Sequence, residues 1–250
     1  MRRTKDEIAK MRRAGKVVAE IHEKTRAVIA PGVTTLQIDK VARDVIEARG
    51  ARSNFLGYNG FPAVICTSPN SMIVHGIPGS YVLKEGDIIS IDAGAIIDGY
   101  HGDAAYTAAI GEISDRAALL LKVTEESLWK AIDVIRDGNR LNEIGRAVET
   151  HVKPYGFGIV REYVGHGIGT AMHESPQITN YWPGEPGPKM KVGNVFAVEP
   201  MINLGAPETV TLEDGWSVVT KDGSLSAHFE QSNDRRNRSI YHRPIPTFLP

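Results

Sequence analysis

The sequence predicts an α+β protein built from two similar halves. Each half begins with two segments of helical periodicity and continues as short strand-like runs broken by turns. The echo between the halves lies at a shift of 106 residues, which pairs Gly32, Ile38, Ala42 and Gly50 with Gly138, Ile144, Val148 and Gly156. It predicts halves of about 1–110 and 111–230 around a pseudo-twofold axis, with a site that draws residues from both. Because no linker or low-complexity run separates them, we expect a single domain over residues 1–230.

Helix signals are clear at the N-terminus. Thr4 with Glu7, and Thr34 with Gln37, match the capping box, in which each side chain binds the other residue's backbone N–H. We therefore predict one helix from about residue 4 to the Ala-Pro-Gly turn at 30–32 and a second from 34 to 50. Strands should follow at about 63–67, 87–92 and 104–110.

The second half repeats this order. Apolar residues at helical spacing predict helices over about 115–135 and 141–152. Strand-like runs follow at 158–161, 195–202, 216–220 and 224–230.

Composition narrows the class of protein. The chain has 250 residues, a formal net charge of -1 and one cysteine, Cys66. The balanced charge argues against a dedicated DNA-binding protein, and a lone cysteine excludes an intrachain disulfide. No apolar run approaches the roughly 18 residues of a membrane span, and the N-terminus lacks the apolar core of a secretory signal. We therefore expect a cytoplasmic protein with no DNA or membrane partner.

Five charged or metal-ligating side chains stand at strand ends or tight turns, where charge is costly: Asp92, Asp103, His166, Glu199 and Glu230. Each alone is an ordinary strand end, cap or loop residue. Together, four converging carboxylates would repel one another unless cations neutralise them. The set predicts two adjacent divalent metal ions, and its oxygen-rich character favours Mn, Fe(II), Co or Zn.

Two histidines fit a catalytic role better than a ligand role. His75 lies in Val-His-Gly-Ile-Pro, and His173 follows His166 by seven residues. An imidazole at either position could donate to a developing oxyanion or handle the leaving amine. Each could equally be a hydrogen-bonded loop histidine.

These motifs resemble those of the type I methionine aminopeptidases in their short bacterial form. The matching stretches are 60–66, 74–78, 86–103, 165–169, 172–174, 198–201 and 226–230, and they span residues 4 to about 230 in the expected order. The resemblance implies the pita-bread fold, with helices flanking a curved antiparallel sheet. It implies removal of the initiator methionine from nascent polypeptides, a preference for a small second residue, and a monomer.

The resemblance also assigns roles to residues. It implies Asp92 on one metal, His166 and Glu199 on the other, and Asp103 and Glu230 bridging both, with Glu199 also serving as proton shuttle. His75 and His173 would stabilise the tetrahedral intermediate. The methionine pocket would be formed by Tyr58, Phe61, Cys66, Met172 and Trp216, with His75 and His173 also contacting the substrate. Asn70 and Ser226 match positions near a monovalent-cation site in some relatives.

The chain departs from that family after Glu230, where His-Thr and an apolar strand usually follow. Here residues 231–238 read Gln-Ser-Asn-Asp-Arg-Arg-Asn-Arg. We interpret 231–250 as an atypical tail, too polar and proline-rich for a buried strand, and hypothesise that a reading-frame change produced it. Such a tail would hold Glu230 less firmly. Basic residues at Arg2-Arg3, interpreted as solvated, and at Arg235-Arg236 give a further hypothesis of transient contact with ribosomal RNA.

Two alternatives stay open. A proline-specific peptidase of the same fold would share the five-ligand pattern, although such relatives usually carry an additional N-terminal domain. A non-catalytic pita-bread protein that binds partners would typically have lost metal ligands, and all five are present here.

Overall fold

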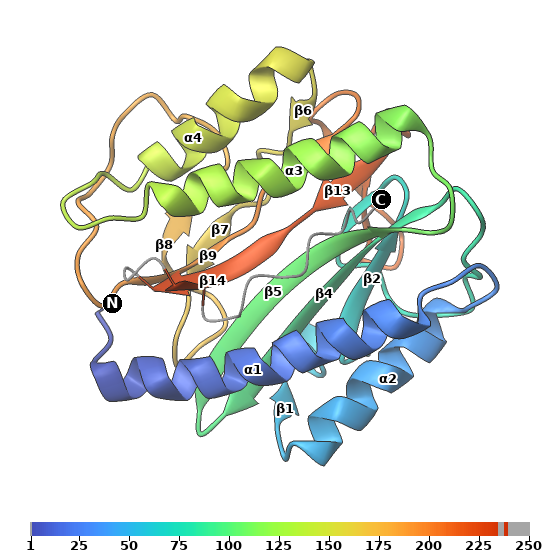
Figure 1. Cartoon of the computed structure of the whole chain (residues 1–250), viewed down its shortest axis with the longest axis horizontal. Coiled ribbons are helices and arrows are strands. Elements are labelled where there is room, and N and C mark those ends of the chain that lie inside the picture. The colour runs from blue at the N-terminus through green and yellow to red at the C-terminus, as the bar shows by residue number, and fades with distance from the viewer. Residues whose placement is uncertain (1, 235–237, 240–250) are drawn as a thin grey trace.

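The computed structural model describes residues 2–234 and 238–239. Within these residues the α-helices are α1 (Lys5–Val28), α2 (Thr35–Ala48), α3 (Asp115–Asp133) and α4 (Glu143–Val152). Single 3₁₀ turns cover Tyr58–Gly60 and Lys153–Tyr155. In Figure 1, α1 and α2 lie beside the part of the central sheet that contains β4 and β5, and α3 and α4 lie beside the part that contains β7, β8 and β9.

The first two helices start as their sequence predicts. Thr4 and Thr34 are the N-caps, and in each capping box the side chain accepts from the third helical N–H, 3.2 Å away in both cases. The end of α2 is equally local in origin. Gly50 has a φ of +59°, and the N–H groups of Gly50 and Ala51 turn back to the carbonyls of Glu47 and Ile46 at 3.1 and 3.0 Å. This is the Schellman arrangement that a glycine after a helix favours.

The main sheet is antiparallel throughout and runs in the order β1-β4-β5-β14-β9-β7-β8, with β2 also paired to β4 and β15 to β14. Its strands are β1 (Arg52–Ser53), β2 (Ile65–Pro69), β4 (Ile88–Ile97), β5 (Tyr100–Ala109), β7 (Gly165–Gly167), β8 (Glu174–Ile178), β9 (Val195–Val198), β14 (Glu230–Asp234) and β15 (Arg238–Ser239).

Two small antiparallel sheets complete the β-structure of the described residues. One joins β13 (Ser226–His228), β10 (Met201–Asn203) and β6 (Gly158–Ile159). The other joins β11 (Thr209–Thr211), β12 (Val218–Thr220) and β3 (Met72–Val74). The predicted strand over 195–202 is therefore two strands, β9 and β10, which belong to different sheets. Pro200 separates them because it has no N–H to offer a ladder.

One face of the main sheet packs against the helices. Alternate residues of β4 and β5, among them Ile91, Ala93, Ala104 and Tyr106, join the aliphatic residues of α1 in the core. Gly102 lets α1 approach closely, since a Cβ at that position would lie 2.8 Å from the backbone nitrogen of Gly15. The other face of the sheet is thereby left for polar residues.

The expectation that the chain after Glu230 is too polar for a buried strand is wrong for residues 231–233. These residues continue β14 in the middle of the main sheet, between β5 and β9, and Gln231, Ser232 and Asn233 are buried. The hydroxyl of Ser232 donates to the Asp103 carbonyl at 2.8 Å, and the Asn233 amide donates to the Gln231 carbonyl at 2.9 Å. Buried polar side chains are tolerated when they are hydrogen-bonded. Residues 235–237 and 240–250 of the predicted tail lie outside the described residues.

The prediction of an α+β chain is confirmed by this mixture of helices and antiparallel sheets. In the described part of the chain, no helix is long and apolar enough to cross a membrane.

Gly145, in the first turn of α4, provides a test of the packing. Alanine normally favours a helix over glycine, but a Cβ at Gly145 would lie 2.3 Å from the Tyr181 carbonyl oxygen and 2.4 Å from that of Thr179. We expect Gly145→Ala to destabilise the protein by about 1–3 kcal/mol, the usual cost of overpacking. The measurement is the melting temperature by calorimetry.

Gly79→Ala is the matched control. Gly79 has an ordinary φ, and a Cβ there would meet nothing closer than 3.9 Å. A Gly145→Ala protein that melts at or above the wild-type temperature would show that α4 does not pack on the segment around 179–181 as described.

Candidate active site

The five predicted ligands come from five neighbouring strands of the main sheet. Asp92 lies in β4, Asp103 in β5 and His166 in β7. Glu230 is the first residue of β14, and Glu199 directly follows β9. In sheet order these strands run β4-β5-β14-β9-β7, so the ligands form one row across the sheet.

The register of the strands places all five side chains on the same face. Asp92 and Glu230 are both paired with Ala105, and Asp103 lies two residues before Ala105. On the other side of β14, Ser232 and His166 are both paired with Ala197, which lies two residues before Glu199. Because directly paired residues, and residues two apart along a strand, share a face, the five ligands must project together.

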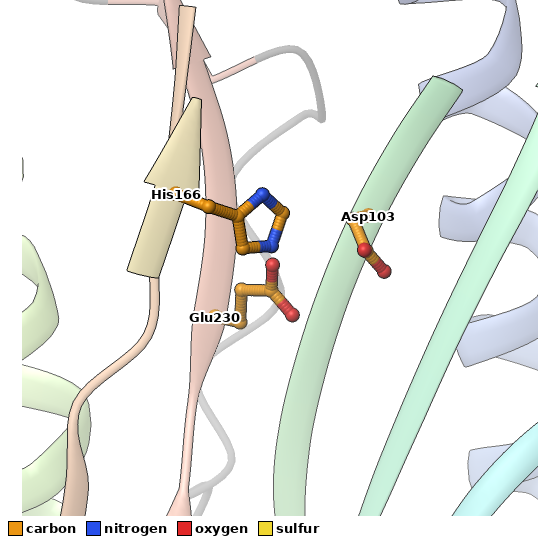
Figure 2. A group of neighbouring side chains, drawn as sticks. All are labelled: Asp103, His166 and Glu230. Atoms are coloured by element: carbon orange, nitrogen blue, oxygen red, sulfur yellow. The ribbon is translucent and has the colours of Figure 1, made fainter. Parts of the chain in front are cut away.

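The side chains converge accordingly. Asp103, His166 and Glu230 each offer a ligand atom, and these atoms lie within 4.8 Å of one another. Figure 2 shows His166 and Glu230 directed toward Asp103 across the space between their strands. Glu199 joins the group because its Oε1 is 3.5 Å from Nε2 of His166.

Burial makes this cluster of acids electrostatically costly. Asp103 is 3% and Glu230 2% exposed. Burial raises the pKa of Asp92 to about 7. Burial and the charge of Asp92 also raise the pKa values of Asp103, Glu199 and Glu230 well above their ordinary range, and these neighbours add to one another's shifts. Without cations the group would therefore retain protons at neutral pH.

The donor set fits divalent cations. In the described part of the chain, Asp92 Oδ1, Asp103 Oδ1 and Glu230 Oε1 are buried without any hydrogen-bond partner. Buried oxygens of this kind require either a proton or a metal ion. His166 is prepared as a ligand, because its Nδ1 lies 3.0 Å from the Gly167 carbonyl and burial lowers its pKa to about 4. The ring is then neutral, with Nε2 free to bind a metal.

His75 and His173 lie beside this cluster. The ring of His173 packs edge-on against that of His166, with centroids 4.4 Å apart, and its Nδ1 is 2.8 Å from the hydroxyl of Tyr58. His75 adopts a left-handed backbone with a φ of +62°, and its ring lies edge-on to Trp216 at 6.4 Å. Burial, reinforced by the charge of His173, lowers the pKa of His75 to about 4. His75 is therefore neutral and able to donate a hydrogen bond at neutral pH.

An apolar cluster adjoins the acids. Phe55, Phe61, Ala63, Cys66 and Met172 pack together, with Ile77 and Trp216 against them. Cys66 is paired with Asp92 across β2 and β4, so its side chain points to the ligand face. Burial and the charge of Asp92 raise the pKa of Cys66, which keeps it a neutral thiol. The structure thus brings four of the five predicted pocket residues together.

Tyr58 lies elsewhere. It is 38% exposed and contacts His173 through its hydroxyl and ring, outside the apolar cluster. Its place in a methionine pocket stays a prediction. Asn70 and Ser226 do meet, since the Ser226 N–H donates to the Asn70 carbonyl at 2.9 Å.

Sequence reasoning missed His228 and Phe55. His228 is 1% exposed, and neither of its ring nitrogens has a hydrogen-bond partner among the described residues, although Nε2 lies 3.8 Å from Glu199 Oε2. Its position two residues before Glu230 was the available signal, because strand periodicity places such a residue on the ligand side. Phe55 had no comparable signal, because it lies in an irregular segment before the first 3₁₀ turn.

Comparisons with known proteins agree with this geometry. Residues 9–231 match the model of the metallopeptidase family M24. The chain is 50% identical to methionine aminopeptidase 1 of Bacillus subtilis over 230 residues, which cover 92% of this chain and 93% of that protein. The crystal structure of a methionine aminopeptidase from Thermotoga maritima superposes with a TM-score of 0.93 at 40% identity and covers 96% of this chain and 99% of that one.

The fold is shared more widely. An Xaa-Pro dipeptidase from Bacillus anthracis has a TM-score of 0.77 at 22% identity, and the match covers 99% of this chain and 63% of that one. Identity this low indicates a common fold and no more. The predicted pita-bread fold is confirmed by these neighbours.

The raised pKa values predict how a metal-free protein responds to pH. The folded state holds protons on Asp103, Glu199 and Glu230 that the unfolded chain has already released, so stability falls as pH rises. The buried histidines, whose pKa values are lowered from 6.5, oppose this trend only below that value. In chelator, we expect the melting temperature to fall between about pH 7 and pH 9.

Mn²⁺ should raise the melting temperature more at pH 8 than at pH 6, because the metal displaces protons from its ligands. Asp103→Asn is the control and should flatten the dependence on pH in chelator. A metal-free melting temperature that rises or stays constant over this range would contradict the convergence of the acids.

Proposed function

The chain belongs to the metallopeptidase family M24, and on that premise we propose that it removes the N-terminal methionine from other polypeptides. It is a metal-dependent aminopeptidase of the methionine aminopeptidase type. Water would be added across the first peptide bond, to release free methionine and a polypeptide with a new N-terminal amine. The single observation that supports methionine as the residue removed is the apolar cluster beside the acids.

That cluster suits a thioether. Its walls are aromatic rings and sulfur atoms from Phe61, Cys66, Met172 and Trp216, and these groups make favourable contacts with a methionine side chain. Cys66 stands opposite Asp92 in the sheet, so a side chain bound in the cluster would leave the adjacent peptide carbonyl at the ligands. Selectivity for methionine would therefore be coupled to the position of the reacting bond.

The five ligands would hold two divalent ions. Asp103 and Glu230 would bridge them, Asp92 would complete one site, and His166 and Glu199 the other. Such ions, when bound, supply Lewis acidity that polarises the scissile carbonyl and lowers the pKa of a water. The ligand set is compatible with Mn, Fe(II), Co or Zn, among which the supply in the cell would decide.

Glu199 would move the proton in this reaction. Its carboxylate oxygens lie 3.5 Å from His166 Nε2 and 3.8 Å from His228 Nε2, and its pKa is raised by burial and by Asp92. Because a raised pKa makes a carboxylate a stronger base, Glu199 could take a proton from the attacking water and return it to the leaving amine. Glu199 would thus serve both as ligand and as proton shuttle.

His75 and His173 would stabilise the tetrahedral intermediate. The pKa of His75 is lowered to about 4, so at neutral pH its imidazole is neutral and donates a hydrogen bond without adding charge. The Tyr58 hydroxyl, 2.8 Å from His173 Nδ1, fixes the orientation of the second ring. Hydrogen-bond donors that are already oriented toward a developing oxyanion stabilise it more strongly than the same donors do in water.

The substrates would be nascent chains in the cytoplasm whose second residue is small, such as Gly, Ala or Ser. A monomer and a brief contact with the ribosome remain part of the proposal. Arg3, however, cannot take part in that contact. It was expected on a solvated face, but it is 7% exposed and ion-paired within the protein. Arg235-Arg236 lies outside the described residues, and Arg2 remains exposed.

A monovalent cation near Asn70 and Ser226 is a lesser part of the proposal. The Asn70 side chain is engaged with Asp87 at 2.9 Å and Tyr81 at 3.1 Å, and its carbonyl accepts from Ser226. The carbonyl, carboxylate and hydroxyl oxygens of this segment are the kind of ligand that such a cation would take.

A proline-specific peptidase and a non-catalytic binding protein remain the alternatives. The first shares the fold at low identity. The second would need no complete ligand set, and here all five ligands project from one sheet face.

Hydrolysis of Met-Gly-Met-Met is the primary test. We expect metal-stripped protein to release no methionine and protein supplied with Mn, Fe(II), Co or Zn to release it. Asp103→Ala should be inactive because a bridging ligand is lost. Leu-Gly-Met-Met and Met-Arg-Met-Met are the control peptides and should react far more slowly.

No release with any of the four metals, from protein shown by elemental analysis to bind them, would favour the non-catalytic alternative. Cleavage of a peptide before proline, in place of Met-Gly-Met-Met, would favour the proline-specific peptidase.

His173→Ala should leave metal content intact and reduce kcat by about 10²–10³-fold, the usual effect of removing one oxyanion donor. His151→Ala is the matched control, since His151 lies on α4 beside Glu126, away from the ligands. Steady-state kinetics and elemental analysis check both variants. Turnover near the wild-type value would exclude the proposed role of His173.

A further inference from the structure

Arg3 is an arginine buried just before the first helix. It precedes the N-cap Thr4, and its side chain is 3% exposed. Burying a guanidinium is costly unless it is paired, so its partners indicate what it does. One partner, Glu7, lies in the first turn of α1, and the other, Glu174, is 171 residues away at the start of β8.

The guanidinium pairs with Glu174, the first residue of β8. Its Nη2 donates to both carboxylate oxygens of Glu174, while Nη1 lies 3.6 Å from Glu7 Oε1. Hydrogen bonds between a guanidinium and a carboxylate are charge-assisted and stronger than neutral ones, so this contact ties the N-terminal segment to the start of β8. The pair is also shielded from solvent, unlike the Arg13–Asp98 pair, in which both side chains are exposed.

Glu174 in turn closes the loop 169–173. Its Oε1 accepts from the N–H groups of Thr170 at 2.9 Å and Ala171 at 3.1 Å, and from the Thr170 hydroxyl at 3.3 Å. Burial alone would raise the pKa of Glu174, but the Ala171 N–H and the charge of Arg3 keep it below its ordinary value. The carboxylate is therefore ionised and links Arg3 to the backbone of the loop.

Arg3 is tightly packed against the backbone of two loops. A Cβ at Gly169 would lie 2.0 Å from Nη2 of Arg3, so the guanidinium packs directly on the loop backbone. The Arg3 N–H donates to the Gly193 carbonyl at 2.6 Å, and a Cβ at Gly193 would lie 2.5 Å from the Arg3 carbonyl. The N-terminal segment is thus seated between two loops of the second half.

The loop that Arg3 reaches carries two residues of the active site. Met172 packs in the apolar cluster, and His173 lies edge-on to the ligand His166 at 4.4 Å. Both lie between the backbone amides that Glu174 binds and Glu174 itself. A displacement of this short loop would therefore move a wall of the pocket and a hydrogen-bond donor at once.

We propose that Arg3 is a positioning residue for the reaction, which through Glu174 holds the loop 169–173 so that Met172 and His173 face the substrate. This inference rests on the proposed function. Catalytic groups lose much of their effect when displaced by about 1 Å, even by a change remote from the chemistry. The N-terminal segment would thus act as a strap that preorganises the site.

The test compares Arg3→Met, Glu174→Gln and the double variant with wild type. Methionine keeps most of the buried volume of Arg3, and glutamine keeps an acceptor for the Thr170 and Ala171 amides. We expect each single change to lower kcat/KM for Met-Gly-Met-Met by about 10–100-fold, with lower kcat and higher KM, and with unchanged metal content. The double variant should be no worse than either single one, because both changes break the same link.

Three controls separate positioning from general stability. Arg2→Met removes the neighbouring exposed cation, whose Nε donates to the Val192 carbonyl, and should leave the kinetics unchanged. Breaking the exposed pair with Arg13→Met and Asp98→Asn should give additive, negligible effects. Arg3→Lys should restore activity in part, since it keeps the charge but lacks the planar fork.

Hydrogen exchange at Thr170 and Ala171 provides a readout that does not depend on turnover. We expect faster exchange in Arg3→Met and in Glu174→Gln, with the core strands unchanged. Unaltered kinetics, or a lowered melting temperature with normal kcat and KM, would overturn the proposal. A wild type that releases no methionine would refute the proposed function instead, and unchanged exchange in Arg3→Met would then still refute the strap.

Discussion

The mutual repulsion of four carboxylates on one buried sheet face is the constraint that the rest of the structure accommodates. Asp92, Asp103, Glu199 and Glu230 cannot move apart, because strand register fixes their backbones and the opposite face packs on α1. The two glutamates stand where the chain passes from one sheet to another, between β9 and β10 and between β13 and β14. Two segments that are distant in the sequence, one at Glu199 and one at Glu230, thereby contribute carboxylates to the same cluster.

The imidazoles complement this charge by remaining neutral. Burial lowers the pKa values of His75 and His166 to about 4 and that of His228 to about 3. No histidine of this group therefore competes with a dication for the carboxylates at neutral pH. In the proposed reaction the environment would separate the tasks: the acids would supply negative charge, His166 a neutral nitrogen ligand, and His75 and His173 uncharged hydrogen-bond donors.

The sequence was informative where the determinants are local. Both capping boxes and the glycine end of α2 depend on residues a few positions apart, and the five ligands stood out because acids at the ends of apolar strands are costly. Prediction from the sequence failed where the hydrogen-bond or ion-pair partner of a residue is remote in the chain. In the buried strand at 231–233, the Ser232 hydroxyl donates to the Asp103 carbonyl and the backbone pairs with neighbouring strands. The buried guanidinium of Arg3 pairs with Glu174. Polarity alone made both look solvated, since such partners become neighbours only in the fold.

The position of β14 has a consequence for how the molecule is made. β14 follows nearly all other strands in the chain, yet it lies in the middle of the main sheet and joins β5 to β9. Until that segment has been synthesised, Asp92 and Asp103 face an open sheet edge with no opposite ligands. Pairing between such distant segments is intrinsically slow, because a long loop must be closed before the contact is gained. The row of five acidic and imidazole side chains is therefore complete only once residues 230–234 have been added to the chain.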